Sequence, residues 1–208
     1  MPIGPVIRQM LGPLERPISE AYRSIFVDLT AFVGQIQQWS SASNILELGC
    51  GEGAVVERLV TGFPKASITG IDITPRVGRM FKGDSTRVIF KQQDIKDFAP
   101  ENLETFDLLI MSDIMHHIPW EVHEKLLTDA RKVLKPGGYL VLKDWERRVT
   151  PIHFLCYFAD RFITGDRVRY KSANELQKLL EAVFGANCVK ARARIRPWAN
   201  NIVFLVQV

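Results

Sequence analysis

The chain has 208 residues, of which 47% are hydrophobic and 24% are charged, and its formal net charge is +4. These values are typical of one folded domain and exclude a disordered chain or two full-sized domains. No segment approaches the roughly 20 apolar residues of a membrane span, and prolines and glycines interrupt residues 1–14, where a secretory signal would be apolar. We therefore expect a cytoplasmic protein whose three cysteines, lacking a C-x-x-C pair, are reduced thiols.

Apolar residues recur at helical spacing over residues 18–39, which predicts one amphipathic helix laid against the domain. From residue 44, short apolar runs that end in turn residues alternate with helical segments. The expected strands are 45–48, 67–71, 88–91, 106–111 and 138–143, and the expected helices are 54–60, 75–81 and 121–134. This alternation predicts a doubly wound, mostly parallel α/β sheet with helices on both faces.

The C-terminal part departs from strict alternation. A predicted helix over 172–184 precedes two strands, 189–195 and 201–208, which a short turn around Pro197 joins. Such a hairpin adds an antiparallel strand at the edge of the sheet.

The first predicted strand runs into a glycine-rich loop, residues 49–53, that opens a helix. Glycines allow close approach of the backbone, and the helix N-terminus offers free N–H groups, so a nucleotide-like ligand is expected there. The glycines alone would also fit a relaxed dinucleotide fingerprint. Glu47 and Glu52 would repel a pyrophosphate, which favours a cationic ligand without phosphate. Asp72, which ends the second strand, is placed to accept from both hydroxyls of a ribose.

Five motifs follow one another in the order found in class I S-adenosylmethionine-dependent methyltransferases, and the chain resembles that family from about residue 44 to residue 143. The motifs are ELGCGEG at 47–53, Asp72, QDI at 93–95, SDIMHHIP at 112–119 and LKPGG at 134–138. The resemblance implies S-adenosylmethionine as cofactor, S-adenosylhomocysteine as product, and a seven-stranded sheet in the order 3-2-1-4-5-7-6 with the last strand antiparallel.

On this basis, residues 1–208 are expected to form one methyltransferase domain. It would consist of an N-terminal helical cap (1–40), a cofactor-binding core (44–143), a substrate-side insertion (144–171), and a C-terminal helix and hairpin (172–208).

The resemblance also implies which residues bind the cofactor. Gly49 and Gly51 would contact its methionine part and Asp72 its ribose, while the remaining contacts would surround the adenine and the far side of the ligand. The full expected set is Glu47, Gly49, Cys50, Gly51, Gly53, Asp72, Ile73, Asp94, Ile95, Met111 and Ser112. Plainer interpretations stay open: Glu52 as a first-turn helix carboxylate, Cys50 as a small filler, and Asp94 as an Asx turn.

Methyl transfer to a hydroxyl needs a base beside the carboxyl end of the fourth strand, where crevices of doubly wound sheets open. His116 lies there and resembles the catalytic histidine of small-molecule O-methyltransferases, although it could also merely line the pocket. His117 is expected to pack beneath the following helix or to reach the substrate.

An aromatic-rich segment at 151–161 follows the fifth strand, and in this family such insertions select the substrate. His153, Phe154, Tyr157 and Phe158 have spacings that predict a shared helical face, although an aromatic stripe is often plain core. The expected substrate-side residues are His117, Asp144, Trp145, His153, Tyr157 and Tyr170.

No metal is expected. Asp113 and Asp144 could be mistaken for the carboxylate pair of metal-dependent catechol-type methyltransferases, but the neighbouring Asn of that pattern is missing after Asp144.

Base methylation of nucleic acid is disfavoured because residues 112–115 replace the Asn/Asp-Pro-Pro-aromatic loop of such enzymes. The basic residues Lys190, Arg192, Arg194 and Arg196 alternate with apolar ones, which predicts a solvated edge strand, or else a surface for an acidic carrier protein or RNA. The sequence favours an enzyme that methylates a small, aromatic hydroxylated metabolite, free or carrier-bound. The alternatives are an RNA methyltransferase and a non-catalytic cofactor-binding scaffold, and the accepting atom (O, C or N) stays open.

Overall fold

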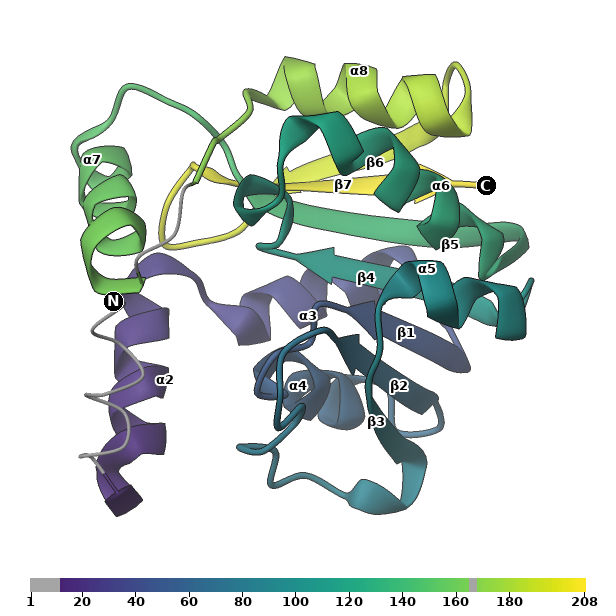
Figure 1. Cartoon of the computed structure of the whole chain (residues 1–208), viewed down its shortest axis with the longest axis horizontal. Coiled ribbons are helices and arrows are strands. Elements are labelled where there is room, and N and C mark those ends of the chain that lie inside the picture. The colour runs from purple at the N-terminus through teal and green to yellow at the C-terminus, as the bar shows by residue number, and fades with distance from the viewer. Residues whose placement is uncertain (1–11, 165–167) are drawn as a thin grey trace.

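The computed structural model describes residues 12–164 and 168–208. Its centre is a seven-stranded sheet in the order β3-β2-β1-β4-β5-β7-β6 (Figure 1). The strands are β1 Asn44–Leu48, β2 Ser67–Asp72, β3 Val88–Gln92, β4 Phe106–Ser112, β5 Leu134–Trp145, β6 Val189–Arg194 and β7 Asn201–Gln207. Strands β1 to β5 pair in parallel, and β7 pairs antiparallel with both β5 and β6. The predicted fold class and strand order are confirmed, with β6 as the edge strand beyond the antiparallel β7.

Helices cover both faces of this sheet, as a parallel sheet requires. The α-helices are α2 Glu15–Phe26, α3 Leu29–Trp39, α4 Ala54–Gly62, α5 Ile95–Phe98, α6 His123–Lys132, α7 Pro151–Phe158 and α8 Ala173–Phe184. Apolar residues of α5, α6 and α8 form one core with one face of the sheet, and those of α3 and α4 form a second core on the other face. None of these helices is long and apolar enough to cross a membrane.

The helix predicted over 18–39 is two helices. Val27 adopts an extended conformation that ends α2, and the Asp28 carboxylate accepts from the Ala31 N–H at 2.8 Å, which starts α3. Helix α2 buries no residue, and its charged side pairs with α4, for example Arg16 with Glu57 at 2.5 Å. The first 11 residues of the expected N-terminal cap, and 165–167 of the expected insertion, lie outside the described residues.

The helix predicted over 75–81 is wrong, since this segment forms turns. Arg76 and Gly78 have φ angles of +62° and +69°, which a right-handed helix cannot accommodate. A Cβ at Gly78 would lie 2.5 Å from the Phe90 ring, so the segment packs too closely against β3 for a helix. The Gly78 N–H instead donates to the Gly51 carbonyl at 2.9 Å, which ties these turns to the glycine loop.

Strand β5 is longer than the predicted 138–143, and α6 ends earlier than predicted, at Lys132. The pairing of β4 with β5 jumps from Leu134 to Tyr139, so the intervening residues 135–138 (KPGG) bulge out of the sheet rather than only stopping a helix. The extension pairs Asp144 and Trp145 with β7. These two residues therefore belong to the rigid sheet and not to the expected insertion.

Candidate active site

The glycine loop follows β1 at the carboxyl edge of the sheet. Gly49, Gly51 and Gly53 have φ angles of +78°, +50° and +92°, the left-handed region that favours glycine. A Cβ at Gly49 would overlap the Ile114 side chain, so this position requires glycine for space as well. Gly53 caps α4, whose first N–H groups face the loop. The sequence-based interpretation of this loop as a close-approach ligand site agrees with its backbone.

Asp72 ends β2 beside this loop. One of its carboxylate oxygens accepts from the Gly51 N–H at 2.7 Å, and the other accepts from the N–H and hydroxyl of Thr74, both at 2.8 Å. These bonds fix the carboxylate while leaving lone pairs for a ligand. The adjacent Ile73 is 71% exposed, an unusual position for a large apolar side chain that suits contact with a flat ring.

The remaining expected cofactor residues, at the adenine and at the far side of the ligand, differ in how much surface they offer to a ligand. Asp94 accepts from the Lys96 N–H at 3.0 Å and caps α5, so the Asx-turn interpretation holds whether or not this residue also binds a ligand. Ile95 and Met111 are buried in the core that α5, α6 and α8 form with the sheet, and their side chains have almost no surface to offer a ligand. Ser112 ends β4, where its hydroxyl donates to Asp113 at 3.4 Å.

Glu47 is the one expected cofactor residue with a strongly perturbed carboxyl. It is only 2% exposed, and burial, with a smaller effect of the Asp72 charge, raises its pKa to about 8. Its Oε2 has no hydrogen-bond partner among the described residues. Glu52, by contrast, pairs with Arg79 at 2.5 Å. A mostly protonated Glu47 and a paired Glu52 repel a phosphate less than the sequence suggested.

Cys50 fills space, as its plainer interpretation held. It is buried, its thiol packs against β2 so that a Cβ at Gly70 would lie 2.9 Å from the sulfur, and burial raises the pKa of the thiol. Such a thiol is not a nucleophile.

S-adenosylmethionine fits this part of the structure on three observations. A Cβ at Gly51 would meet nothing nearer than Asp72 at 4.0 Å, so the loop is open toward the crevice. The unpartnered Oε2 of Glu47 can accept a hydrogen bond from an ammonium group, and the exposed Ile73 beside the fixed Asp72 carboxylate suits an adenosine.

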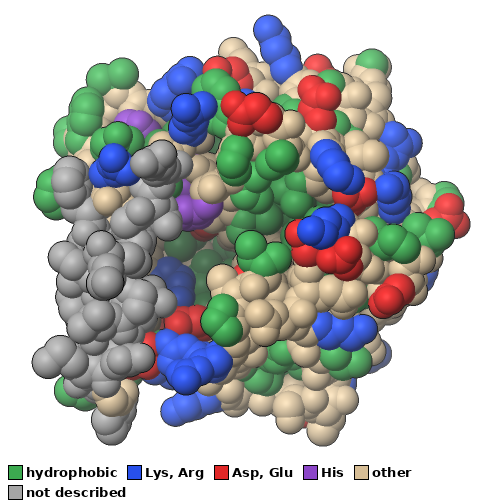
Figure 2. All heavy atoms as spheres, viewed as in Figure 1, with side chains coloured by type: hydrophobic (Ala, Val, Ile, Leu, Met, Phe, Trp, Pro, Cys, Tyr) green, Lys and Arg blue, Asp and Glu red, His purple; other side chains and the backbone are tan. Residues whose placement is uncertain are grey.

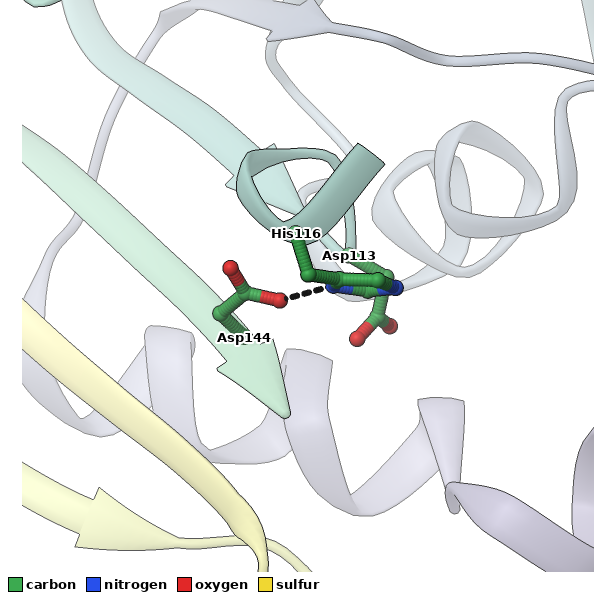
Figure 3. A group of neighbouring side chains, drawn as sticks. All are labelled: Asp113, His116 and Asp144. Atoms are coloured by element: carbon green, nitrogen blue, oxygen red, sulfur yellow. Dashed lines mark hydrogen bonds and ion pairs between the residues drawn. The ribbon is translucent and has the colours of Figure 1, made fainter. Parts of the chain in front are cut away.

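His116 lies on a short 3₁₀ turn, Met115–His117, after β4 (Figure 3). Its Nδ1 is hydrogen-bonded to Oδ1 of Asp144, at the end of β5, and the same oxygen accepts from the Trp145 N–H at 2.8 Å. Burial alone would lower the pKa of His116, but the bond to Asp144 and the charges of Asp144, Asp113 and Asp160 raise it overall. A carboxylate that fixes one imidazole nitrogen leaves Nε2 for a substrate.

Tyr170 packs against His116 from the segment before α8. The two rings stack with centroids 5.0 Å apart and planes at 27°. The Tyr170 hydroxyl donates to the carboxylate of Asp160 and lies 3.6 Å from the Cys156 sulfur, while burial raises the pKa of the phenol. Tyr170 therefore stacks on the imidazole of His116 and restrains it, while its expected contact with the substrate stays a prediction.

Asp113, His116 and Asp144 bring potential metal-ligand atoms within 4.8 Å of one another (Figure 3). Both oxygens of Asp113, however, lie 2.6 Å from the buried Lys143 ammonium, which together with His116 and His117 lowers the pKa of that carboxyl against the effect of burial. The lysine thus supplies the positive charge that a metal would supply. That no metal takes part stays a prediction.

His117 does not pack beneath the following helix, as one interpretation held. Its side chain is exposed, and its ring centroid lies 4.2 Å from that of His116. The packing role belongs to His123, which is buried and whose Nε2–H donates to the carbonyls of Met115 and Ile118, both at 3.0 Å. Burial lowers the pKa of His123, which keeps it neutral. His123 therefore fixes both ends of the turn that carries His116.

Of the four ring side chains predicted to share a face of the aromatic segment, only His153 packs against other predicted site residues. His153 accepts from the Trp145 indole N–H at 3.0 Å and packs edge-on against Tyr170, with ring centroids 5.0 Å apart. Phe154 and Phe158 are more than half exposed and Tyr157 is 46% exposed. The predicted shared face is therefore wrong, because His153 lies against the sheet while the aromatic residues lie on the open side of α7.

The structure adds Lys143, His123 and Asp160 to the predicted site residues. A lysine inside the apolar run of β5 is the signal that could have identified Lys143, since such a charge is buried only when it is paired. No sequence signal marks Asp160, whose carboxylate accepts from Tyr170, 10 residues further along the chain.

Comparison with known proteins agrees with this fold. Residues 45–138 match the sequence model of a family described as "Methyltransferase domain". The chain is 33% identical over 114 residues to a trans-aconitate 2-methyltransferase of Paracidovorax citrulli (strain AAC00-1), a match that covers 55% of this chain and 43% of that protein. It is 23% identical over 147 residues to a ubiquinone biosynthesis O-methyltransferase of Vibrio parahaemolyticus serotype O3:K6 (strain RIMD 2210633), with 66% of this chain and 61% of that protein covered.

The apo crystal structure of the S-adenosylmethionine-dependent methyltransferase SibL superposes with a TM-score of 0.75 at 17% identity, over 94% of this chain and 59% of SibL. The chain thus spans less than two thirds of the length of each of these three proteins. The matched domain and the fold are those of class I S-adenosylmethionine-dependent methyltransferases, which the chain resembles in both respects. This agrees with the family resemblance and with S-adenosylmethionine as the cofactor that the sequence predicted.

Proposed function

We propose that this protein transfers the methyl group of S-adenosylmethionine to a hydroxyl group of a small aromatic metabolite, free or bound to a carrier protein, with His116 as general base. The observation that carries the proposal is the buried His116–Asp144 pair at the carboxyl end of β4. S-adenosylhomocysteine is the second product. The expected cytoplasmic location is part of the proposal and would be tested by cell fractionation.

When bound, the cofactor supplies a methyl group activated by a positively charged sulfur. The residues placed to hold it are the loop at 49–53, the Asp72 carboxylate and the exposed Ile73, with Glu47 beneath them. Binding at this loop would bring the ligand to the crevice that β4 and β5 border, as in other doubly wound sheets.

His116 would accept the proton of the attacking hydroxyl at Nε2. Asp144 holds Nδ1 and stabilises the imidazolium that forms, while the Tyr170 ring and the His123 hydrogen bonds prevent the turn from shifting. A base oriented in this way contributes typically about 10²–10⁴-fold to a rate. His153, whose Nδ1 is occupied by Trp145, has its Nε2–H available as a donor to the substrate.

Two relatives support a small-molecule acceptor, since one is named for trans-aconitate and the other for ubiquinone biosynthesis. The aromatic and imidazole rings around His116 favour a flat acceptor among small molecules.

The RNA alternative is weakened by the basic residues near the edge strand. Arg194 pairs with Glu146 at 2.6 Å, and Arg196 pairs with Asp28 at 2.6 Å, so two of the four alternating cations already have carboxylate partners within the chain. The same observation weakens docking of an acidic carrier protein along this strand. A non-catalytic scaffold would bind the cofactor without turnover.

The first experiment is calorimetric titration with S-adenosylmethionine and, separately, with NADH. We expect micromolar binding of the former alone, and binding of NADH alone would contradict the proposed cofactor site. Asp72→Ala should weaken cofactor binding by at least about tenfold, because a hydrogen-bonded charged contact is worth about 1.5–3 kcal/mol.

The second experiment tests the base. A screen of phenols and catechols, with S-adenosylhomocysteine formation as the readout, would first identify an acceptor. His116→Ala should then lower turnover about 10²-fold or more while sparing cofactor affinity, and added imidazole should restore part of the rate. Equal loss of binding and turnover, without rescue, would contradict the assignment of His116 as base.

A further inference from the structure

Helix α7 is apolar on its outer side as well as its inner side. Its eight residues, PIHFLCYF, include no acidic or basic residue other than His153. On the inner side, Cys156 and Ile152 pack against Trp145 and Tyr170. On the outer side, Phe154, Leu155 and Phe158 are 63%, 51% and 54% exposed. A helix that is apolar all round is normally covered on all sides, and within residues 12–164 and 168–208 this one is covered on one side only.

The exposed surface continues beyond the helix. Val149, just before α7, is 94% exposed, and Trp198, in the loop between β6 and β7, is 37% exposed. A groove of about 480 Å³ between the helix and this loop is lined by Pro151, Leu155 and Trp198. We call Val149, Phe154, Leu155, Phe158 and Trp198 the α7 patch. Figure 2 shows hydrophobic side chains gathered where Figure 1 places α7, with Lys and Arg side chains beside them.

Arginines border the α7 patch at both ends of the helix. Arg147 and Arg148 precede it, and Arg161 follows it and is exposed. Arg148 donates to the Ala199 carbonyl at 3.4 Å, which places it beside Trp198. The carboxylates nearby are each held by a partner: Glu146 is buried against Arg194 and lies 4.0 Å from Arg148, Glu175 pairs with Arg147 at 3.0 Å, and Asp160 accepts from Tyr170. The rim of the patch therefore presents mainly positive charge to a partner.

We propose that the α7 patch docks this protein on the surface of an anionic phospholipid bilayer. The centre of the patch, Phe154, Leu155 and Phe158, has no polar side-chain atoms, so it offers no directional bonds to a protein partner and suits the acyl-chain boundary of a bilayer. The guanidinium groups of Arg148 and Arg161 lie at the rim, where lipid phosphates would meet them. At eight residues, α7 is about 12 Å long, so it would lie in the interface rather than cross it.

The patch and the candidate active site share one helix. The inner side of α7 carries His153, which contacts Trp145, and Trp145 donates in turn to Asp144. Docking through the outer side would therefore place the substrate side of the crevice next to the membrane, where a lipophilic acceptor concentrates. This last step rests on the proposed function, whereas the docking itself does not.

The test is co-sedimentation of the full chain with vesicles of phosphatidylcholine alone and of phosphatidylcholine mixed with phosphatidylserine. We expect binding to the mixed vesicles that weakens at high salt, and little binding to phosphatidylcholine. The double variant Phe154→Ser, Phe158→Ser should lower the partition coefficient at least about tenfold. The double variant Arg148→Gln, Arg161→Gln should remove the preference for phosphatidylserine.

Matched controls lie at the opposite end of the strands. Leu103→Ser removes an apolar side chain that is 59% exposed before β4, and Lys65→Gln removes an exposed cation before β2, and neither should change vesicle binding. Each variant is checked for an unchanged Tm and unchanged S-adenosylmethionine binding, which separates this test from that of the enzyme. Wild-type protein that stays in the supernatant with both vesicle types would overturn the proposal. So would a dimer in solution that the Phe154→Ser, Phe158→Ser variant abolishes, since the patch would then be an interface between two copies.

Discussion

Replacing Glu47 by glutamine should make the protein more stable, and increasingly so as the pH rises. Burial raises the pKa of this carboxyl from 4.5 to about 8. Between these two values the unfolded chain has lost the proton and the folded chain has kept it, so wild-type stability falls as the pH rises. Glutamine has nearly the shape of the protonated acid and no proton to lose, so the stability of the variant lacks this decrease with rising pH.

The size of the effect follows from the two pKa values. Each pH unit between them costs the wild type about 1.4 kcal/mol, which integrates to about 3 kcal/mol at pH 7 and to about 5 kcal/mol above pH 8. For a chain of this length, 1 kcal/mol corresponds to about 2–4 °C in Tm, so the variant should melt roughly 6–12 °C above the wild type at pH 7.

The assay is thermal unfolding of both proteins in steps from about pH 5 to about pH 8.5, without cofactor, because a cationic ligand would change the surroundings of Glu47. Glu52→Gln is the matched control: it lies in the same loop but in an accessible ion pair with Arg79, and its difference from wild type should stay small across this range. A difference in Tm for Glu47→Gln that does not grow with pH would refute the buried, protonated carboxyl.

Three further substitutions test the surroundings of His116, and a fourth tests the glycine loop. Asp144→Asn removes the main cause of the raised pKa of His116, so the acid limb of the pH–rate profile should move to lower pH while the plateau rate falls about 10²–10⁴-fold, measured as S-adenosylhomocysteine formation. Asp160→Asn should move the same limb in the same direction but less far, because the Asp160 charge raises that pKa less than the Asp144 and Asp113 charges do. His123→Ala should lower the free energy of unfolding by about 2–4 kcal/mol in urea titration, since two buried carbonyls lose their donor. Gly49→Ala should cost about 2 kcal/mol or more in the same titration and should abolish S-adenosylmethionine binding in calorimetry, because the added methyl overlaps Ile114 in a left-handed backbone.

The sheet could be predicted from the sequence because its signals are local. A buried parallel strand is a short apolar run, and each run here ends at a turn residue, so the strands and their order followed from pattern and family likeness. The failures came where a single contact overrides the local pattern. Asp28 caps a second helix inside an apparently continuous one, and Gly78 packs against Phe90 where helical spacing had predicted a turn of helix.

The site residues likewise divide into those whose positions could be predicted from local signals and those whose positions depend on distant contacts. The glycine loop and Asp72 are continuous with strand ends, so their positions follow once the strands are known. The partners of His116 come from separate parts of the chain: Asp144 is 28 residues away, and Tyr170 is held by Asp160 in an irregular segment. The sequence likewise could not predict which face of α7 packs against the sheet, because a helix that is apolar all round has no amphipathic pattern to indicate its buried side.

The charges around His116 explain why a lysine is buried there. Asp113 and Asp144 both lie near the imidazole, and two uncompensated carboxylates would hold it as an imidazolium, which cannot accept a proton. Lys143 lies within 2.6 Å of both oxygens of Asp113 and so offsets one of the two negative charges. Lys143→Met should therefore raise the pKa of His116 further and move the acid limb of the pH–rate profile to higher pH, the reverse of Asp144→Asn. If both variants moved that limb in the same direction, the charge balance argued here would be wrong.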